Sequence, residues 1–252
     1  MKPSASGRIL MWHGGSLWIG LAGEPAATHS HHAVQISLAF PAGTVRLQSF
    51  SGVWTSYRAA IVAAHVSHAF EARGQHVAQI FIEPESRDGR RLQLRYGKDG
   101  IASISTLGLD NEVKTLSTGY ESRATDAQLV AAALIAIATI IGATAPAKQP
   151  DPRIALAVEL IRKRSGEAIA LGEIARAVHL SPDRFRHLFM EETGVAFRPY
   201  LLWQRLECSL AAYVCGKSLT DAAYGGGFAD SAHFSRTFKR MFGISPVSVR
   251  PE

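Results

Sequence analysis

The sequence is poor in cysteine, which excludes a disulfide framework. It has 2 cysteines in 252 residues, and Cys208 and Cys215 stand seven positions apart in one expected helix. Two helical turns separate such positions by about 10 Å, which is too far for a disulfide bond. No metal-ligand pattern surrounds them, so both are expected to be plain thiols in a reducing compartment, the cytoplasm.

No part of the chain carries a large excess of one charge. The net charge is +6 and the sequence pI is about 9.5. Residues 150–252 hold 14 Lys and Arg against 11 Asp and Glu, a net of +3, and the remainder holds 13 against 10, again +3. This mild charge is compatible with a nucleic-acid partner but does not identify one, so any DNA-binding interpretation must rest on pattern.

Several functional signatures are missing. The N-terminal residues lack a basic stretch followed by an apolar run, so no signal peptide is expected. A Gly-rich phosphate loop, a nucleophile elbow and a His-Glu-x-x-His helix are absent as well, which argues against the common hydrolase and kinase classes. One charge-free run, residues 129–147, is rich in Ala and interrupted by Thr, Gly and Pro. Its weak hydrophobicity favours a helix buried in a core or dimer interface over a membrane span.

The first half of the chain is expected to be β-structure and the second half helical. Residues 8–119 contain short apolar runs separated by turn residues, as in an all-β sandwich or barrel. The runs are SLWIGLA, AVQISLAF, TVRLQSF, RAAIVAA and VAQIFIE. A helix capped by Thr125 or Asp126 is expected over residues 123–142. Three prolines in residues 145–152 mark a linker, and helices and short turns follow it.

A helix-turn-helix pattern occupies residues 171–194. The apolar face of its first helix is expected to consist of Leu171, Ile174, Ala175 and Val178. His179-Leu180 interrupts the pattern, and Ser181-Pro182 then places an N-cap before a proline at the first helical position. Gly194 suits the left-handed residue that ends the second helix. Phe185, Leu188 and Phe189 recur on the inward face of that helix, which leaves its charged face outward.

The same pattern occurs a second time near the C-terminus. At an offset of 48 positions, Ile174-Ala175 corresponds to Ala222-Ala223, and His179-Leu180 corresponds to Gly227-Phe228. After the turn the offset between the two copies becomes 49 positions. At that second offset Phe234, Phe238 and Gly243 match Phe185, Phe189 and Gly194. Asp230 or Ser231 is expected to cap the second helix. A long apolar helix, starting at Phe197, is expected to hold the two copies rigidly apart.

Two such units on one rigid frame would suit double-stranded DNA. One recognition helix covers a few base pairs, and two of them can enter successive major grooves about 34 Å apart. The phenylalanines are core residues under any interpretation, and basic residues on a helix are often only a solvated face. A helical solenoid would repeat at a fixed period over three or more units, and this chain has two units joined by a long helix.

Residues 150–252 resemble the DNA-binding domain of the AraC/XylS family of transcription regulators. GFADSAHFSRTFKRMFGISP (227–246) is similar to the signature of that family, and LSPDRFRHLFMEETG (180–194) with RLECSLA (205–211) is similar to its first half. The chain departs from the pattern at Gly225 and Gly226, where the family usually keeps better helix formers, and at Val249, where it often has Tyr. Each glycine costs about 1 kcal/mol inside a helix, so the first helix of the second unit is expected to be short or loose.

The resemblance implies which residues meet DNA. Base contacts are expected from Asp183, Arg186 and His187 in the first unit and from Ala232, Ser235 and Arg236 in the second. Arg suits the O6 and N7 atoms of guanine, and Ala can meet a thymine methyl group. Phosphate contacts are expected from Ser181, Arg184, Ser231, Lys239 and Arg240, including the backbone amides near the two serines.

A cluster of histidines lies in the N-terminal half. On one strand His29, His31 and Gln35 would share a face while His32 points away, because side chains alternate. The spacing Gly-x5-His-x-His-x3-Gln resembles the first cupin motif, with Gln35 where metal-binding cupins carry Glu, and His68 stands where the second cupin motif has its His. The resemblance implies a cupin-type sensor domain over roughly residues 10–120.

Three functions remain open for this cluster. His29, His31, Gln35 and His68 would bind a divalent metal such as Zn²⁺ or Ni²⁺, or line a pocket for a small organic effector. Most sensor domains of the family bind organic ligands, which favours the second. A metal-dependent cupin enzyme tethered to DNA is the alternative from another class, and the missing Glu at position 35 weighs against it.

The sequence therefore predicts a two-domain regulator and not an enzyme. An N-terminal all-β cupin-like barrel with appended helices (1–122) senses an effector, a helix and Pro-rich linker (123–152) mediate homodimerisation, and an all-α domain (153–252) binds DNA through two helix-turn-helix units. The family favours an activator that works with RNA polymerase over a repressor. No membrane partner is expected.

Overall fold

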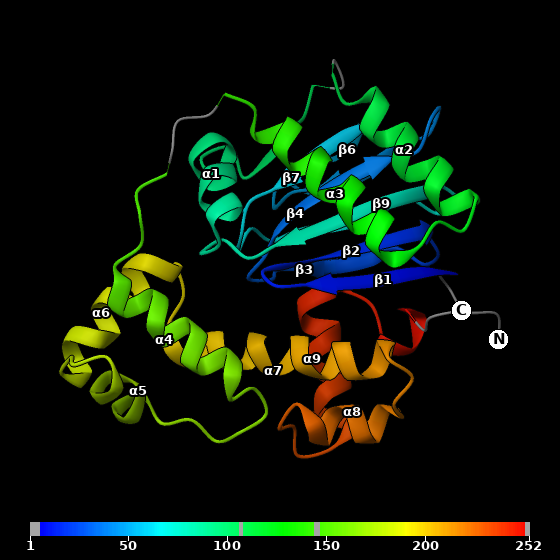
Figure 1. Ribbon diagram of the computed structural model, residues 1–252. Helices are drawn as coiled ribbons and strands as arrows, with labels where there is room; N and C mark the ends of the chain where they lie inside the picture. Colours follow the sequence, from blue (N-terminus) through cyan, green and yellow to red (C-terminus); the bar gives the residue numbers. More distant parts are fainter. Residues whose placement is uncertain (1–5, 106–107, 144–146, 250–252) are drawn as a thin grey trace. The chain divides into compact units, whose positions relative to one another are not determined.

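The structure is a computed structural model, which describes residues 6–105, 108–143 and 147–249 (Figure 1). It divides into two compact units, residues 1–147 together with 238–252, and residues 148–237. The N-terminal part is rich in strands and the C-terminal part is helical, so the predicted fold class is confirmed.

Ten strands form two antiparallel sheets in the N-terminal part. The six-stranded sheet has the order β1-β2-β9-β4-β7-β10, and the four-stranded sheet has the order β3-β8-β5-β6. The bounds are β1 Ser6–Trp12, β2 Gly15–Leu21, β3 Ala26–His29, β4 Val34–Ala39, β5 Val45–Gln48, β6 Trp54–Tyr57, β7 Ala59–Val62, β8 His68–Glu71, β9 His76–Ile82 and β10 Ile101–Ser103. Each of the five apolar runs in the sequence overlaps one of these strands over at least four residues.

A helix covers one face of the larger sheet. Helix α3 (Asp126–Ile141) buries Leu129, Ala133, Ile137 and other apolar side chains in the same core cluster as Ile36 and Ile80, which face each other across β4 and β9. It lies across the strands beside helix α2 (Asp110–Glu121) (Figure 1). Thr125 caps α3, because its hydroxyl accepts the Gln128 N–H while the Gln128 side chain accepts the Thr125 N–H. The predicted helix and one of its two candidate caps are therefore present.

The expectation of β-structure throughout residues 8–119 was wrong at two places. Helix α1 (Arg87–Tyr96) follows β9, and α2 follows β10. Ser86 starts α1 by accepting the Gly89 N–H, and Leu92 is buried beneath the helix. In α1 the apolar residues Leu92, Leu94 and Tyr96 alternate with polar ones, which is the period of a strand. In α2 the few apolar residues stand three or four positions apart among many polar ones, so the helical pattern is weak. Among the described residues, no helix is long and apolar enough to cross a membrane.

Helices make up the C-terminal part. They are α4 Pro152–Lys163, α5 Leu171–Ala177, α6 Pro182–Thr193, α7 Phe197–Val214, α8 Leu219–Gly225 and α9 Ser231–Phe242, with a short 3₁₀ helix at Pro246–Val249. The expected linker over residues 145–152 lies partly outside the described residues. Its end is defined by Asp151, whose carboxylate accepts the Arg153 N–H and so caps α4. Cys208 and Cys215 are free thiols, as expected.

Gly225 and Gly226 do not weaken the helix before the second turn. Helix α8 has 7 residues, the same length as α5. Gly225 is its last residue and Gly226 its C-cap, so neither carries the cost of a glycine inside a helix. The helix is short, as one form of the expectation had it, and its looseness stays a prediction. Gly226 is needed for another reason. A Cβ there would lie 2.0 Å from Ser209 Oγ and 2.6 Å from the Arg205 carbonyl oxygen, both on α7.

These two glycines provide a matched test of that close approach. We expect Gly226→Ala to destabilise the chain by about 1–3 kcal/mol, because the added methyl group overlaps α7. Gly225→Ala adds the same methyl group where nothing lies within 4 Å, and is expected to change stability by less than about 1 kcal/mol. Denaturant unfolding followed by circular dichroism measures both. Equal losses in the two variants would contradict the packing argument.

Candidate functional site

The first helix-turn-helix unit consists of α5, a tight turn and α6. His179 adopts a left-handed conformation in the turn, with φ of 57°. Ser181 then caps α6 by accepting the Arg184 N–H at 3.3 Å, and Pro182 occupies the first turn of the helix. Gly194, with φ of 73°, ends it. These are the start and stop residues that the sequence indicates, because capping and left-handed backbone depend on local chemistry.

The second unit, α8 and α9, has the same backbone. Gly227 occupies the position of His179 at the offset of 48 and is also left-handed, with φ of 78°. Asp230 is the residue that caps α9, since its carboxylate accepts the His233 N–H at 2.6 Å. Gly243, with φ of 71°, follows the last turn. The duplication in the sequence is therefore a duplication of turn geometry.

The recognition helices α6 and α9 each bury one aromatic face. Phe185, Phe189, Phe234 and Phe238 are all fully buried. On the opposite face of α6, the predicted base-contacting residues Asp183, Arg186 and His187 are exposed. On α9, Ala232 and Arg236 are exposed at the equivalent positions, whereas Ser235 is half-buried and its hydroxyl donates to the Ser231 carbonyl at 2.7 Å.

Charged groups on these faces are held only weakly. Arg186 donates to the Asp183 carboxylate at 2.7 Å, with 56% and 84% of the two side chains exposed. Such an exposed pair contributes little to stability, so the guanidinium can exchange this partner for another acceptor at small cost. Among the predicted phosphate contacts, Ser181, Arg184, Lys239 and Arg240 are exposed and Ser231 is half-buried.

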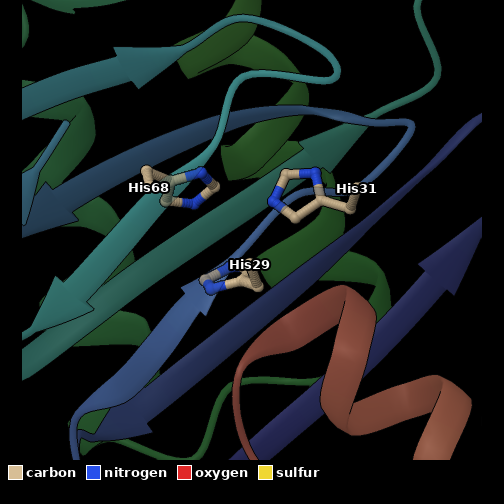
Figure 2. Close-up of side chains that lie close together, drawn as sticks. All are labelled: His29, His31 and His68. Atoms are coloured by element: carbon tan, nitrogen blue, oxygen red, sulfur yellow. The ribbon is translucent and has the colours of Figure 1, made fainter. Parts of the chain in front are cut away.

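The second candidate site is a cluster of three buried histidines in the N-terminal part. Figure 2 shows His29, His31 and His68 pointing toward one another. One potential ligand atom of each lies within 4.8 Å of the others. His29 and His68 are cross-strand partners on β3 and β8, and Gln35 lies on β4. The prediction that His29, His31 and Gln35 lie on one strand was wrong. Strand β3 ends at His29, and the chain bends before β4 begins at Val34.

Backbone carbonyls fix the orientation of all three rings. The Nδ1 atoms of His29, His31 and His68 lie 2.7, 2.9 and 2.9 Å from the carbonyl oxygens of Ala27, Ala33 and Val66. A carbonyl can only accept, so each Nδ1 carries the proton and each Nε2 keeps its lone pair. Metal-binding histidines in proteins are oriented by this same pairing.

Burial keeps these rings uncharged. It lowers the pKa of His68 to about 4, lowers that of His31 well below its usual value and also lowers that of His29. The neighbouring imidazoles lower the pKa of His31 and His68 further, because two positive charges at this distance repel. At neutral pH the cluster is therefore a set of neutral nitrogen donors.

Gln35 completes the set with an amide oxygen. Its Oε1 lies 3.0 Å from His31 Nε2 and 3.1 Å from His68 Nε2, and its Nε2 donates to Ser37 Oγ at 3.0 Å. The Gln35 amide therefore contacts two of the three rings and lies beside the place where their ligand atoms meet. Three imidazoles and one oxygen fit the ligand preferences of Zn²⁺ or Ni²⁺.

An apolar pocket adjoins the cluster. His29 and Gln35 belong to its wall, and so do side chains of the sheets. The apolar part of the wall includes Trp18, Ile19, Phe70, Val77 and Phe81. The pocket can therefore take an apolar group while the histidines meet a polar one.

Sequence reasoning missed a second polar group beside the cluster. His32 Nε2 lies 2.8 Å from the Glu85 carboxylate, and His32 Nδ1 lies 3.2 Å from His65 Nε2. The backbone N–H of His65 also donates a hydrogen bond to the backbone carbonyl of His31 at 2.9 Å. These bonds hold the loop that carries His31 against the loop that precedes His68. Glu85 is 53 residues from His32, and no short-range signal connects them.

The helical region matches a helix-turn-helix family and proteins named as regulators. Residues 174–251 match a family described as a helix-turn-helix domain. The transcriptional activator RhrA of Rhizobium meliloti is 26% identical over 118 residues, which are 45% of this chain and 37% of RhrA. The Msm operon regulatory protein of Streptococcus mutans is 30% identical over 95 residues, 37% of this chain and 34% of that protein. The chain thus spans about a third of the length of these curated relatives.

Solved structures extend the likeness of fold to nearly the whole chain. An apo variant of ToxT from Vibrio cholerae superposes with a TM-score of 0.60 at 14% identity, covering 92% of this chain and 94% of ToxT. Wild-type ToxT bound to an unsaturated fatty acid gives a TM-score of 0.57 at 12% identity, covering 94% and 95%. At such low identity the likeness shows a shared fold, a strand-rich N-terminal part followed by helix-turn-helix units.

Proposed function

We propose that this chain is a sequence-specific DNA-binding transcription regulator of the AraC/XylS family, controlled by an effector. The observation that carries the proposal is the repeated unit: two helices, α6 and α9, with the same caps, the same left-handed turns and the same exposed positions. Two recognition helices in one chain can read two segments of a duplex, as two protomers do in simpler repressors.

Base contacts are assigned to the exposed faces of α6 and α9. Arg186 and Arg236 reach outward on these faces and are suited to guanine, while Ala232 suits a thymine methyl group. Asp183 and His187 flank Arg186, and Ser235 takes part only if its hydroxyl leaves the Ser231 carbonyl. Phosphate contacts are assigned to Ser181, Arg184, Ser231, Lys239 and Arg240.

Arginine truncation tests this assignment. We expect Arg186→Ala or Arg236→Ala to weaken binding to duplexes selected by the wild-type chain by about 1–3 kcal/mol and to relax preference at one or two positions. Lys239→Ala is the matched control. It should weaken binding to all duplexes alike and reduce the salt dependence, since it removes a phosphate contact. Fluorescence anisotropy over a range of salt concentrations measures both effects, and equal losses of Arg variants on random DNA would reassign them to phosphate.

The N-terminal part is assigned to effector binding and to dimerisation. RhrA is named an activator, which favours activation together with RNA polymerase over repression. ToxT has been solved with a fatty acid, which supports a role for the apolar pocket in binding a small organic effector. Effector binding would change the presentation of the DNA-binding region only if it favours one arrangement over another. A regulator of this kind acts in the cytoplasm, where the DNA is.

The dimer is assigned to the outer face of α3. This face is an apolar stripe of exposed side chains, Ala131, Leu134, Ile135 and Ala138, with no charged residue among them. Ile135 is 58% exposed. We expect the wild-type chain to sediment as a dimer and Ile135→Glu as a monomer, because a charge on this stripe would be buried in the interface. Leu94→Glu, on α1 with the same exposure, is the matched control and should remain dimeric. A monomeric wild-type chain would contradict the assignment.

A second candidate function, a metal-responsive regulator, is favoured by the histidine cluster. The specific observation is that the Nδ1 atoms of His29, His31 and His68 all face backbone carbonyls, which leaves three Nε2 lone pairs in one buried place. A metal-dependent cupin enzyme would use the same ligands. The named relatives are regulators, so the metal is assigned to sensing.

Measuring metal uptake distinguishes a metal-responsive regulator from one that binds only an organic effector. We expect chelator-treated chain to take up about one equivalent of Zn²⁺ or Ni²⁺, and His31→Ala or His68→Ala to lower the affinity at least about 10-fold, since each removes a ligand. His13→Ala removes an exposed histidine away from the cluster and should leave uptake unchanged. Isothermal titration calorimetry measures the affinities. Uptake below a tenth of an equivalent would end the metal function while leaving DNA binding intact.

A further inference from the structure

The ligands of the histidine cluster carry no negative charge. They are three neutral imidazoles and the amide oxygen of Gln35, and the group of side chains suited to an ion contains no carboxylate. Glu24 belongs to the wall of the adjoining pocket, but its side chain is 70% exposed and lies 3.8 Å from Arg73. The nearby Glu85 is engaged by His32 at 2.8 Å. None of the residues that the structure describes therefore supplies an anion to this site.

A divalent cation on these ligands would keep its whole charge of about two units in a buried place. His29, His31, His68 and Gln35 are 6%, 3%, 0% and 1% exposed, so water screens that charge poorly. Buried charge is stable in proteins when an opposite charge contacts it. An anion supplied from outside the chain would provide this, and it would bind best as a direct ligand of the cation.

The space next to the cluster decides what kind of anion fits. His29 and Gln35 belong both to the cluster and to the wall of the pocket, whose other members include Trp18, Phe70 and Phe81. An inorganic anion would leave this apolar wall facing water. An organic anion would place its charged group at the cation and its apolar part against the aromatic side chains, which adds hydrophobic burial to the charge pairing.

We propose that the metal-loaded histidine cluster is the anchor for the effector, and that the effector is a small amphiphile with a carboxylate head and an apolar tail. The carboxylate binds the cation held by His29, His31, His68 and Gln35, and the tail lies in the pocket lined by Trp18, Phe70 and Phe81. The inference rests on the proposed metal function of the same cluster. It makes the cation a structural part of the effector site.

Octanoate binding to the full chain, with and without Co²⁺, tests the proposal. We expect octanoate to bind the Co²⁺-loaded chain at least about 10-fold more tightly than the metal-free chain, because the cation adds a counter-charge beside His29 and Gln35, where the pocket meets the cluster. The visible spectrum of the bound Co²⁺ should change on addition. Octanol, with the same tail and no charge, should show neither the gain nor the spectral change. Equal octanoate affinity with and without Co²⁺ would overturn the proposal.

Gln35→Glu provides a second measurement, because it gives the ligand set a negative charge of its own. We expect this variant to hold Co²⁺ at least as tightly as wild type and to bind octanoate at least about 5-fold more weakly, since part of the charge is already compensated. Unchanged or tighter octanoate binding by the loaded variant would contradict the charge argument. Wild-type octanoate and octanol titrations do not depend on this variant folding.

These measurements separate the two levels of the argument. A chain that takes up no Co²⁺ removes the metal function and this inference together. A chain that takes up Co²⁺ but binds octanoate and octanol equally loses only the inference. Binding of selected duplexes by the same preparation is measured independently, so the DNA-binding proposal stands or fails separately.

Discussion

Each recognition helix is oriented by a pair of phenylalanines that have lost contact with water. Phe185 and Phe189 on α6, and Phe234 and Phe238 on α9, are fully buried. Burying one such ring contributes about 1.5–3 kcal/mol, far more than any exposed ion pair on the same helix. Because positions three and four apart share a helix face, this burial also decides which residues point outward. The exposed face of each helix is thus a consequence of its core.

The histidine cluster depends on a different constraint, which is the cost of burying polar groups. Its rings are deeply buried and uncharged, and each Nδ1–H is satisfied by a backbone carbonyl. A buried polar group without a partner is costly, so this pairing fixes both the tautomer and the direction of each ring. The same constraint leaves each Nε2 unprotonated, and one potential ligand atom of each ring lies within 4.8 Å of the others. That is why the cluster is suited to a cation, and why a cation there would in turn require an anion.

The two regions differ in how much of them could be predicted from sequence. The caps at Ser181 and Asp230 and the left-handed Gly194 and Gly243 follow from interactions within a few residues of each other. The helical spacing of the phenylalanines predicts which face of each helix is buried. Helices α1 and α2 were missed, because the apolar residues of α1 alternate as in a strand and those of α2 are few among polar residues. The role of Gly226 was also missed, since the atoms that exclude a side chain there belong to α7.

Local chemistry in the sequence by itself determined the duplicated helix-turn-helix units, the two-domain fold class and the helix over residues 126–141. Convergence of the histidines was decided by tertiary structure, because His29 meets His68 only through the pairing of β3 with β8, and the chain bends between His29 and Gln35. Glu85 reaches His32 across 53 residues, and the apolar pocket is built from several strands. Caps and amphipathic faces are set by neighbours in the chain, whereas a buried polar site is set by which strands pair, and that depends on the fold as a whole.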